Sequence, residues 1–308
     1  MNQLLLAPLL RFQTFTYLRM STSSLVTQDQ IHRFHKTDRE IFSRLVINFM
    51  RDPAESLLVM ALWLWLQDKG FNLMANMLTL SDTIVNALAD EAVICLKCLD
   101  AKTSPNTMSR LAPNGLLFTS RLMEREIPLD MFSQSRYTII SGVKNFLTNI
   151  CARIFTDILQ RVLYPNPQGL LDPNQPLAVP GFPHPVFGSV TIINPMFSSD
   201  HGIPTGGLWG WHPSIELSVD DRTMFLTFSR GFPVSEEEVK ELFIDLLGFY
   251  NCVESVQMEQ VGPNEQPLYA KMVLISVIFV DKILKGNRVS KFRINGKHIW
   301  ARKYERRE

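Results

Sequence analysis

The feature that most restricts how this chain can fold is a run of prolines past its midpoint. Ten of the eighteen prolines lie between Tyr164 and Ser214. Proline fixes φ and has no N–H to donate, so a segment this rich in proline forms neither helix interiors nor central strands. We therefore expect a proline-rich linker or arm over residues 165–217, between two folded domains. Its aromatic residues, such as Phe187 and Trp209, favour an arm that packs against a domain.

Length and composition agree with two domains. The chain has 308 residues, 46% of them hydrophobic and 20% charged, which is enough to bury sizeable cores. The net charge of +1 gives no whole-chain reason to expect nucleic acid, so any basic surface must be local. Four cysteines are too few for a disulfide framework and indicate a reducing compartment. The longest apolar run, Leu57–Leu66, is shorter than the roughly 20 residues that span a bilayer. We expect a buried helix there and no membrane partner.

The half of the chain before the prolines has the periodicity of helices. Asp52, Pro53 and Glu55 have the residue types that begin a helix, and Ser81 is the expected cap of another. Apolar residues from Ile139 to Leu163 recur at the spacing of one long amphipathic helix. We predict an all-α domain over residues 25–164, acting as a protein-interaction module.

The first residues leave two alternatives open. No acidic residue occurs before Asp29, whereas Arg11, Arg19 and several serines and threonines do. That composition suits a transit peptide for a mitochondrion or plastid. The other reading is a short disordered tail over residues 1–24, with the protein in the nucleus or cytoplasm.

After the prolines, strand and helix patterns alternate. Strands are expected over residues 223–228, 253–259, 268–275 and 296–304. Between them, helices are expected over residues 235–248, where Ser235 and Glu238 have capping-box spacing, and 276–286. The order βαββαβ over residues 218–308 predicts a ferredoxin-like α+β domain, so the whole chain is multidomain, α followed by α+β.

Period-two alternation assigns side chains to the two faces of this sheet. If Met224 and Leu226 face the helices, Phe225 faces outward between two threonines. By the same reasoning the outer face also carries Gln257, Tyr269, Lys271, His298, Trp300 and Arg302. Three rings among cations and amides are typical of a surface for single-stranded nucleic acid.

Local charge supports this interpretation. From Lys285 to Arg307 there are nine lysines and arginines and one acidic residue, Glu305. The helix carrying Glu236 to Glu241 balances them in the total and would lie behind the sheet. One face of the domain should therefore carry positive charge and the opposite face negative charge.

Residues 221–305 resemble an RNA-recognition motif. The first family signature is matched by Met224–Ser229, with Phe225 at the stacking position, and the second by Pro267–Leu274. The second match departs from the pattern, because Lys271 stands where another aromatic is usual. The resemblance implies non-catalytic binding of single-stranded RNA, without metal or cofactor. The expected RNA-binding residues are Phe225, Thr227, Gln257, Tyr269, Lys271, His298, Trp300, Arg302 and Lys303.

Most of the chain after residue 25 also resembles a plant-type family that joins a helical region to one such motif. The stretches DREIFSRLVINFMRDPAESLLVMALWLWLQDKGF, LADEAVICLKCL and NEQPLYAKMV…INGKHIWARKY carry this likeness. It implies a post-transcriptional role, with poly(A)-binding protein or another RNA-processing protein as a partner of the helical domain. The alternative is a scaffold whose degenerate motif binds protein rather than RNA.

Other chemistry is not expected. Cys95 and Cys98 have CxxC spacing but lie in a helical pattern without a second ligand pair, which favours buried core cysteines. His32 and His35 are expected on a solvated helix face. Because no nucleophile elbow, phosphate loop or zinc-protease motif occurs, we expect no enzyme.

Overall fold

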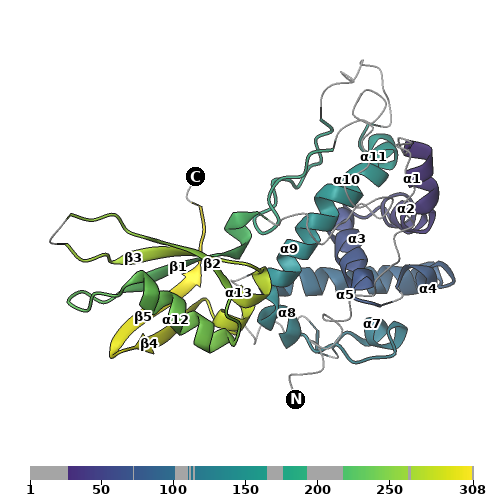
Figure 1. The fold of residues 1–308 in the computed structure, drawn as a ribbon. Coiled ribbons are helices and arrows are strands. Elements are labelled where there is room, and N and C mark those ends of the chain that lie inside the picture. Colours follow the sequence, from purple (N-terminus) through teal and green to yellow (C-terminus); the bar gives the residue numbers. More distant parts are fainter. Residues whose placement is uncertain are drawn as a thin grey trace, which may run out of the picture. The chain divides into compact units, whose positions relative to one another are not determined.

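The computed structural model describes residues 27–71, 73–100, 110, 112–113, 115–164, 176–192, 218–262 and 265–306. These residues form two compact units (Figure 1). The N-terminal unit contains the described residues up to 128, together with 142–164 and 176–192. The C-terminal unit contains 129–141 and those from 218 onward.

The N-terminal unit is helical, as predicted. Its elements are α1 (Gln28–Phe34), α2 (Lys36–Ser43), the π-helix η2 (Arg44–Asn48), α3 (Pro53–Asp68), α4 (Met74–Leu78), α5 (Asp82–Cys98), α7 (Leu117–Leu122), the later part of α9 (Arg136–Phe146), the π-helix η3 (Leu147–Cys151), α10 (Ala152–Ile154) and α11 (Thr156–Leu163). None of the described helices is both long and apolar enough to cross a membrane.

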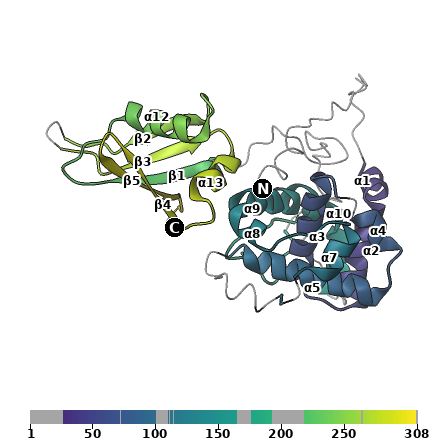
Figure 2. The ribbon, with the colours of Figure 1, turned by 90° about the horizontal axis from the view of Figure 1, so that it is seen from below.

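Helix α3 runs through the middle of this unit, packed against α2, α4 and α5 (Figure 2). It begins as expected, because the Asp52 carboxylate accepts a hydrogen bond from the Glu55 backbone N–H at 2.8 Å. Every residue from Ser56 to Leu66 is buried, Trp63 and Trp65 included. Hydrophobicity on all sides is what a central helix requires, so the apolar run lies in the core.

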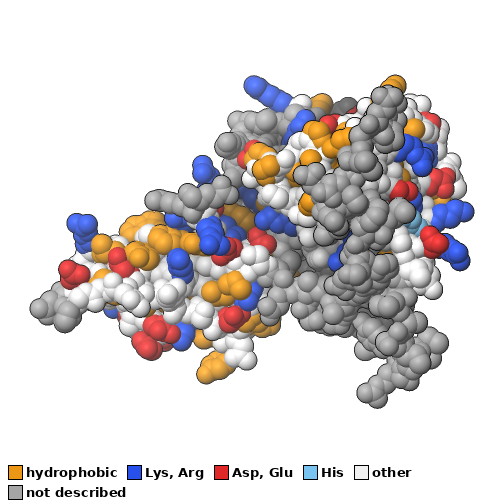
Figure 3. Space-filling view, turned by 90° about the horizontal axis from the view of Figure 1, so that it is seen from above, with side chains coloured by type: hydrophobic (Ala, Val, Ile, Leu, Met, Phe, Trp, Pro, Cys, Tyr) orange, Lys and Arg blue, Asp and Glu red, His pale blue; other side chains and the backbone are white. Residues whose placement is uncertain are grey.

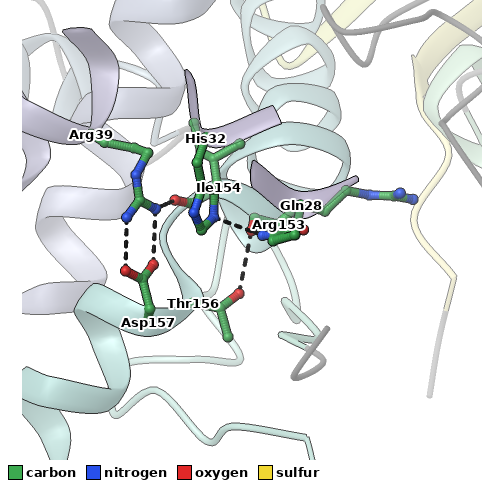
Figure 4. Close-up of polar contacts among 7 residues, drawn as sticks. All are labelled: Gln28, His32, Arg39, Arg153, Ile154, Thr156 and Asp157. Atoms are coloured by element: carbon green, nitrogen blue, oxygen red, sulfur yellow. Dashed lines mark hydrogen bonds and ion pairs between the residues drawn. The ribbon is translucent and has the colours of Figure 1, made fainter. Parts of the chain in front are cut away.

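The single long helix expected over 139–163 is wrong. The chain forms α9, η3, α10 and α11 there, with a break at Phe155, whose ring is fully buried and stacks on Phe42 at a centroid distance of 4.1 Å. Beside the break, Arg39 of α2 donates to the Ile154 carbonyl and makes two hydrogen bonds to the Asp157 carboxylate, at 2.7 and 2.8 Å (Figure 4). These partners lie more than 100 residues apart in sequence, so the local pattern could not indicate the break.

Part of the proline-rich arm packs onto the N-terminal unit. Leu177, Val179, Phe187 and Ile192 are buried, and Leu177 pairs with Ile192 in an antiparallel bridge. This agrees with the preference for a packed arm over a free linker. Residues 165–175 and 193–217, with both of the arm's tryptophans, lie outside the described residues.

The C-terminal unit contains a five-stranded antiparallel sheet. Its elements are α8 (Asp130–Gln134), the start of α9, a 3₁₀ turn η5 (Val219–Arg222), β1 (Thr223–Phe228), α12 (Glu236–Leu247), β2 (Val253–Met258), β3 (Tyr269–Leu274), α13 (Val277–Leu284), β4 (Val289–Ile294) and β5 (Lys297–Lys303). The strand order is β2-β3-β1-β5-β4. The four expected strands and two expected helices are all present, with β3 and β5 on either side of β1.

Strand β4 was missed. It pairs with β5 through a tight connection at Asn295 and Gly296, both of positive φ, and forms one edge of the sheet. Its exposed side chains are Val289, Lys291 and Arg293. Only the charge of this segment was considered in the sequence, and two of its three outward positions are cations. The order is therefore βαββαββ.

The core of this unit lies between the sheet and the helices α12 and α13 (Figure 1). Met224 and Leu226 are fully buried from the strand side, as are Val239 and Val280 from the helices. The predicted inward residues of the third and last strands, among them Met272 and Ile299, are likewise buried. The predicted capping box of α12 is present, with Ser235 and Glu238 each accepting from the other's backbone N–H.

A buried carboxylate helps to join residues 129–141 to this unit. Asp281 of α13 accepts hydrogen bonds from the backbone N–H groups of Tyr137 and Thr138, at 3.0 and 2.8 Å, and from the Thr138 hydroxyl. These N–H groups lie in the first turn of α9 and have no partner within the helix. A residue 144 positions away thus caps α9, a contact that sequence patterns do not indicate.

Candidate nucleic-acid interface

Strand pairing brings most of the expected RNA-binding residues to one face of the sheet. Phe225 of β1 lies opposite Lys271 of β3 and Arg302 of β5. Thr227 lies opposite Tyr269 and Trp300. Directly paired residues of antiparallel strands point to the same face. Because Met224 and Leu226 alternate with Phe225 and are buried against the helices, this face is the outer one.

Three rings on this face are accessible to differing extents. The Phe225 and Tyr269 rings are stacked, with a centroid distance of 5.4 Å and an interplanar angle of 21°. Tyr269 is 37% exposed, whereas Phe225 and Trp300 are half-buried. In Figure 3, hydrophobic side chains gather beside lysine and arginine side chains on the C-terminal unit. The rings of Phe225, Tyr269 and Trp300 therefore form one partly accessible aromatic surface.

Cations lie over two of these rings, Phe225 and Trp300. The guanidinium carbon of Arg302 is 4.5 Å from the Phe225 centroid, and the Lys291 ammonium is 5.3 Å from the Trp300 ring. Such contacts contribute about 0.5–1 kcal/mol at exposed sites, which is enough to orient the cations and weak enough to be exchanged. The aromatic surface is thus bordered by positive charges.

Tyr304 adds a fourth aromatic ring that was not among the predicted RNA-binding residues. The Lys271 ammonium lies 4.8 Å from the Tyr304 ring, and the Tyr304 backbone N–H donates to the Thr223 carbonyl at 3.0 Å. Pairing with β1 therefore continues one residue past β5 and places a fourth, half-buried ring near Lys271. Extending the alternation from Trp300 and Arg302 by two residues would have found it.

Lys303 is not part of this face. It lies opposite the buried Met224, and its ammonium donates to the backbone carbonyls of Asp220 and Tyr304. The alternation of β5 explains this position, since Lys303 follows Ile299 and Ala301 on the inward side. The other eight expected residues remain on the outer face.

Polar groups complete the surface. Gln257 is exposed and lies opposite Lys271, while His298 lies opposite Arg293 of β4. His298 Nδ1 is shielded from solvent without a hydrogen-bond partner among the described residues. Partial burial, together with the charges of Lys291 and Arg293, lowers the pKa of His298. The imidazole is therefore neutral at pH 7, with one ring nitrogen a donor and the other an acceptor.

Strand β4 adds two cations that the sequence did not assign to the interface. Lys291 and Arg293 are exposed on its outer side, opposite Trp300 and His298. With Lys271 and Arg302 they place four positive charges on three strands of one face. Because β4 was not predicted, Lys291 and Arg293 were not expected at this edge of the sheet.

The other candidates are structural. Cys95 and Cys98 are buried in α5, as predicted, and burial raises the pKa of the Cys95 thiol well above its ordinary value. The expectation of a solvated His35 is wrong: it is buried, with Nδ1 2.7 Å from the Asp38 carboxylate. His32 is half-buried and contacts Gln28 (Figure 4). Within the described ranges, no group of three or more histidines, cysteines and carboxylates could hold a metal ion.

None of the protein-family models, curated proteins and solved structures compared with the chain matches it, so the interface is interpreted from its own residues.

Proposed function

We propose that the C-terminal unit is an RNA-recognition motif of ferredoxin-like topology, extended by one edge strand. It binds a short segment of single-stranded RNA on the outer face of its sheet, without catalysis. The observation that carries this proposal is the placement of Phe225, Tyr269 and Trp300 on neighbouring strands of one face, among cations.

Rings and cations have separate roles in this mechanism. Bases stack on the exposed parts of the rings, each contributing roughly 1–3 kcal/mol. Lys271, Lys291 and Arg293 bind the phosphates and release counterions, so affinity falls with salt. Thr227 lies between Tyr269 and Trp300, Gln257 beside Lys271 and His298 beside Arg293. These three polar side chains offer hydrogen bonds to base edges.

Arg302 has a special position because it already covers part of Phe225. A base can stack on the Phe225 ring after the guanidinium swings aside, or on the guanidinium itself. Both modes are used in RNA recognition, because planar guanidinium groups stack on bases much as rings do. Arg302 is therefore proposed as a stacking residue as well as a counter-charge.

The test measures binding of a fluorescent single-stranded RNA to the full chain over a range of salt concentrations. The Phe225→Ala, Tyr269→Ala double variant removes two stacking surfaces and should lose roughly 1–3 kcal/mol for each ring. The matched control is Phe34→Ala, which removes an aromatic side chain that is 50% exposed in the N-terminal unit. Circular dichroism checks that each variant is folded. RNA binding that is equal in the double variant and the parent contradicts the sheet-face assignment.

The helical unit is proposed to recruit a protein, either poly(A)-binding protein or another RNA-processing protein. Only the resemblance of its sequence supports this part. Titration calorimetry of the full chain with purified poly(A)-binding protein tests it directly. The competing function is a scaffold whose sheet binds protein, and failure of the parent chain to bind RNA at low salt would favour it.

A further inference from the structure

An exposed apolar cluster lies on the helix side of the C-terminal unit, away from the candidate RNA surface. It consists of Leu246 in the last turn of α12 and Phe249 and Tyr250 just after it, which we call the helix-end patch. Their exposed fractions are 39%, 54% and 84%. Contiguous exposed apolar side chains on a folded protein mark interaction sites, whereas single ones need no explanation.

Packing holds the centre of this patch in place. The Phe249 ring lies 5.6 Å from the ring of Phe279, a buried residue of α13, and the Lys282 ammonium lies 5.2 Å from the Phe249 ring. Gly248 adopts the left-handed conformation that ends α12 and turns the chain toward Phe249. One side of the Phe249 ring is thus anchored while the rest faces solvent.

Acidic side chains form a row along α12 that ends beside the helix-end patch. Glu237, Glu241 and Asp245 are exposed at spacings of four residues, so they lie on one face of the helix. Like charges at this spacing destabilise a helix. Glu236 is paired with Lys240 and Glu238 with Lys297. Glu241 and Asp245 have no ion-pair partner in the part of the chain that the structure describes.

We propose that the helix-end patch and this acidic row together bind a basic amphipathic segment of a partner protein. An apolar side chain of the partner covers Phe249 and Tyr250, and its lysines or arginines lie along Glu241 and Asp245. Charge complementarity selects this occupant, because the carboxylates repel phosphates and other acidic segments. The proline-rich arm does not have this chemistry, since residues 165–217 contain no lysine or arginine.

The probes are two fluorescein-labelled amphipathic peptides with the same apolar residues, one with lysine and arginine on its polar face and one with glutamate. The full chain should bind the cationic peptide, more weakly as salt increases, and not the anionic one. Phe249→Ser with Tyr250→Ser should lower the affinity about tenfold, because a few aromatic anchors dominate such interfaces. Glu241→Gln with Asp245→Asn should lower it similarly. Phe232→Ser, which changes a residue that is 55% exposed elsewhere in the unit, should have no effect.

Three outcomes would overturn the proposal. One is equal binding of both peptides, and another is parent-like binding by the Phe249 and Tyr250 variant. The third is binding only after residues 1–26 are removed, because that basic and apolar segment of the same chain would then be the occupant. Adding excess RNA tests whether the peptide site is independent of the proposed RNA surface on the sheet. Peptide binding should persist with RNA present, and it should also persist in a protein that binds no RNA.

Discussion

Gly142 of α9 lies so close to the Trp65 indole that no larger residue fits. A Cβ at this position would be 2.1 Å from Trp65 Cδ1 and 2.2 Å from Nε1. Trp65 is itself buried in the central helix, so it has little room to move. The sequence shows Gly142 only as an interruption of an apolar helical pattern, whereas the structure shows why a side chain is excluded there.

Gly142→Ala should therefore destabilise the N-terminal unit although alanine is the better helix former. Overpacking of a core costs about 1–3 kcal/mol, more than the roughly 1 kcal/mol by which alanine favours a helix over glycine. Thermal denaturation followed by tryptophan fluorescence measures the change. Gly262→Ala is the control, because its Cβ would meet nothing closer than 3.7 Å. A Gly142→Ala protein as stable as the parent would contradict the contact with Trp65.

The start of α9 depends on the carboxylate of Asp281, which titrates in an unusual range. Burial raises its pKa to about 6, against the lowering effect of the hydrogen bonds from Thr138 and Tyr137. Its folded pKa thus exceeds its ordinary value of 3.8. The folded state binds the proton more tightly than the unfolded state does, so protonation of Asp281 favours folding.

Stability should therefore fall as pH rises from about 4 to about 6, by at most about 3 kcal/mol from this group, and this contribution stays constant above that range. Asp281→Asn should remove this slope, because an amide does not titrate. Urea denaturation of the full chain at several pH values measures it, with Glu241→Gln, an exposed carboxylate, as the control that keeps it. An unchanged slope in Asp281→Asn would show that other groups cause the dependence.

Elements with local signals were predictable and those set by distant contacts were not. The capping residues Ser235 and Asp52 lie within three positions of their partners, so both helix starts followed from sequence. The break at Phe155 and the capping of α9 by Asp281 depend on residues more than 100 positions away. Strand β4 is an exception, because Lys291 and Arg293 alternate with Phe292 and Ile294 as in a half-buried strand. It was missed because only the charge of this segment was considered.

For the molecule as a whole, the net charge is only +1. Within the C-terminal unit, however, positive and negative side chains lie on opposite sides of the sheet. The outer face of the sheet carries Lys271, Lys291, Arg293 and Arg302, whereas α12 on the opposite side carries Glu237, Glu241 and Asp245. Eight of the nine expected interface residues followed from alternation along four recognised strands. Lys291 and Arg293 required the fifth strand, so the full extent of the basic face follows only from the sheet.

This polarity leads to a prediction for the salt dependence of RNA binding. If β4 contacts phosphates, Lys291→Gln with Arg293→Gln removes two of them. The slope of log affinity against log salt should then become shallower by about 1.4, since each contact with a single strand contributes about 0.7. The preference for one base sequence over another should change little, because phosphate contacts carry no sequence information.

The matched control is Lys240→Gln, which removes a cation from α12 on the opposite side of the sheet and should leave the slope unchanged. Fluorescence anisotropy with one RNA at several salt concentrations gives the slope for each protein. A slope that the β4 variant shares with the parent would show that Lys291 and Arg293 do not contact phosphates. A slope that becomes shallower by about 0.7 in the Lys240 variant, which loses one cation instead of two, would show that net charge, and not the basic face, governs binding.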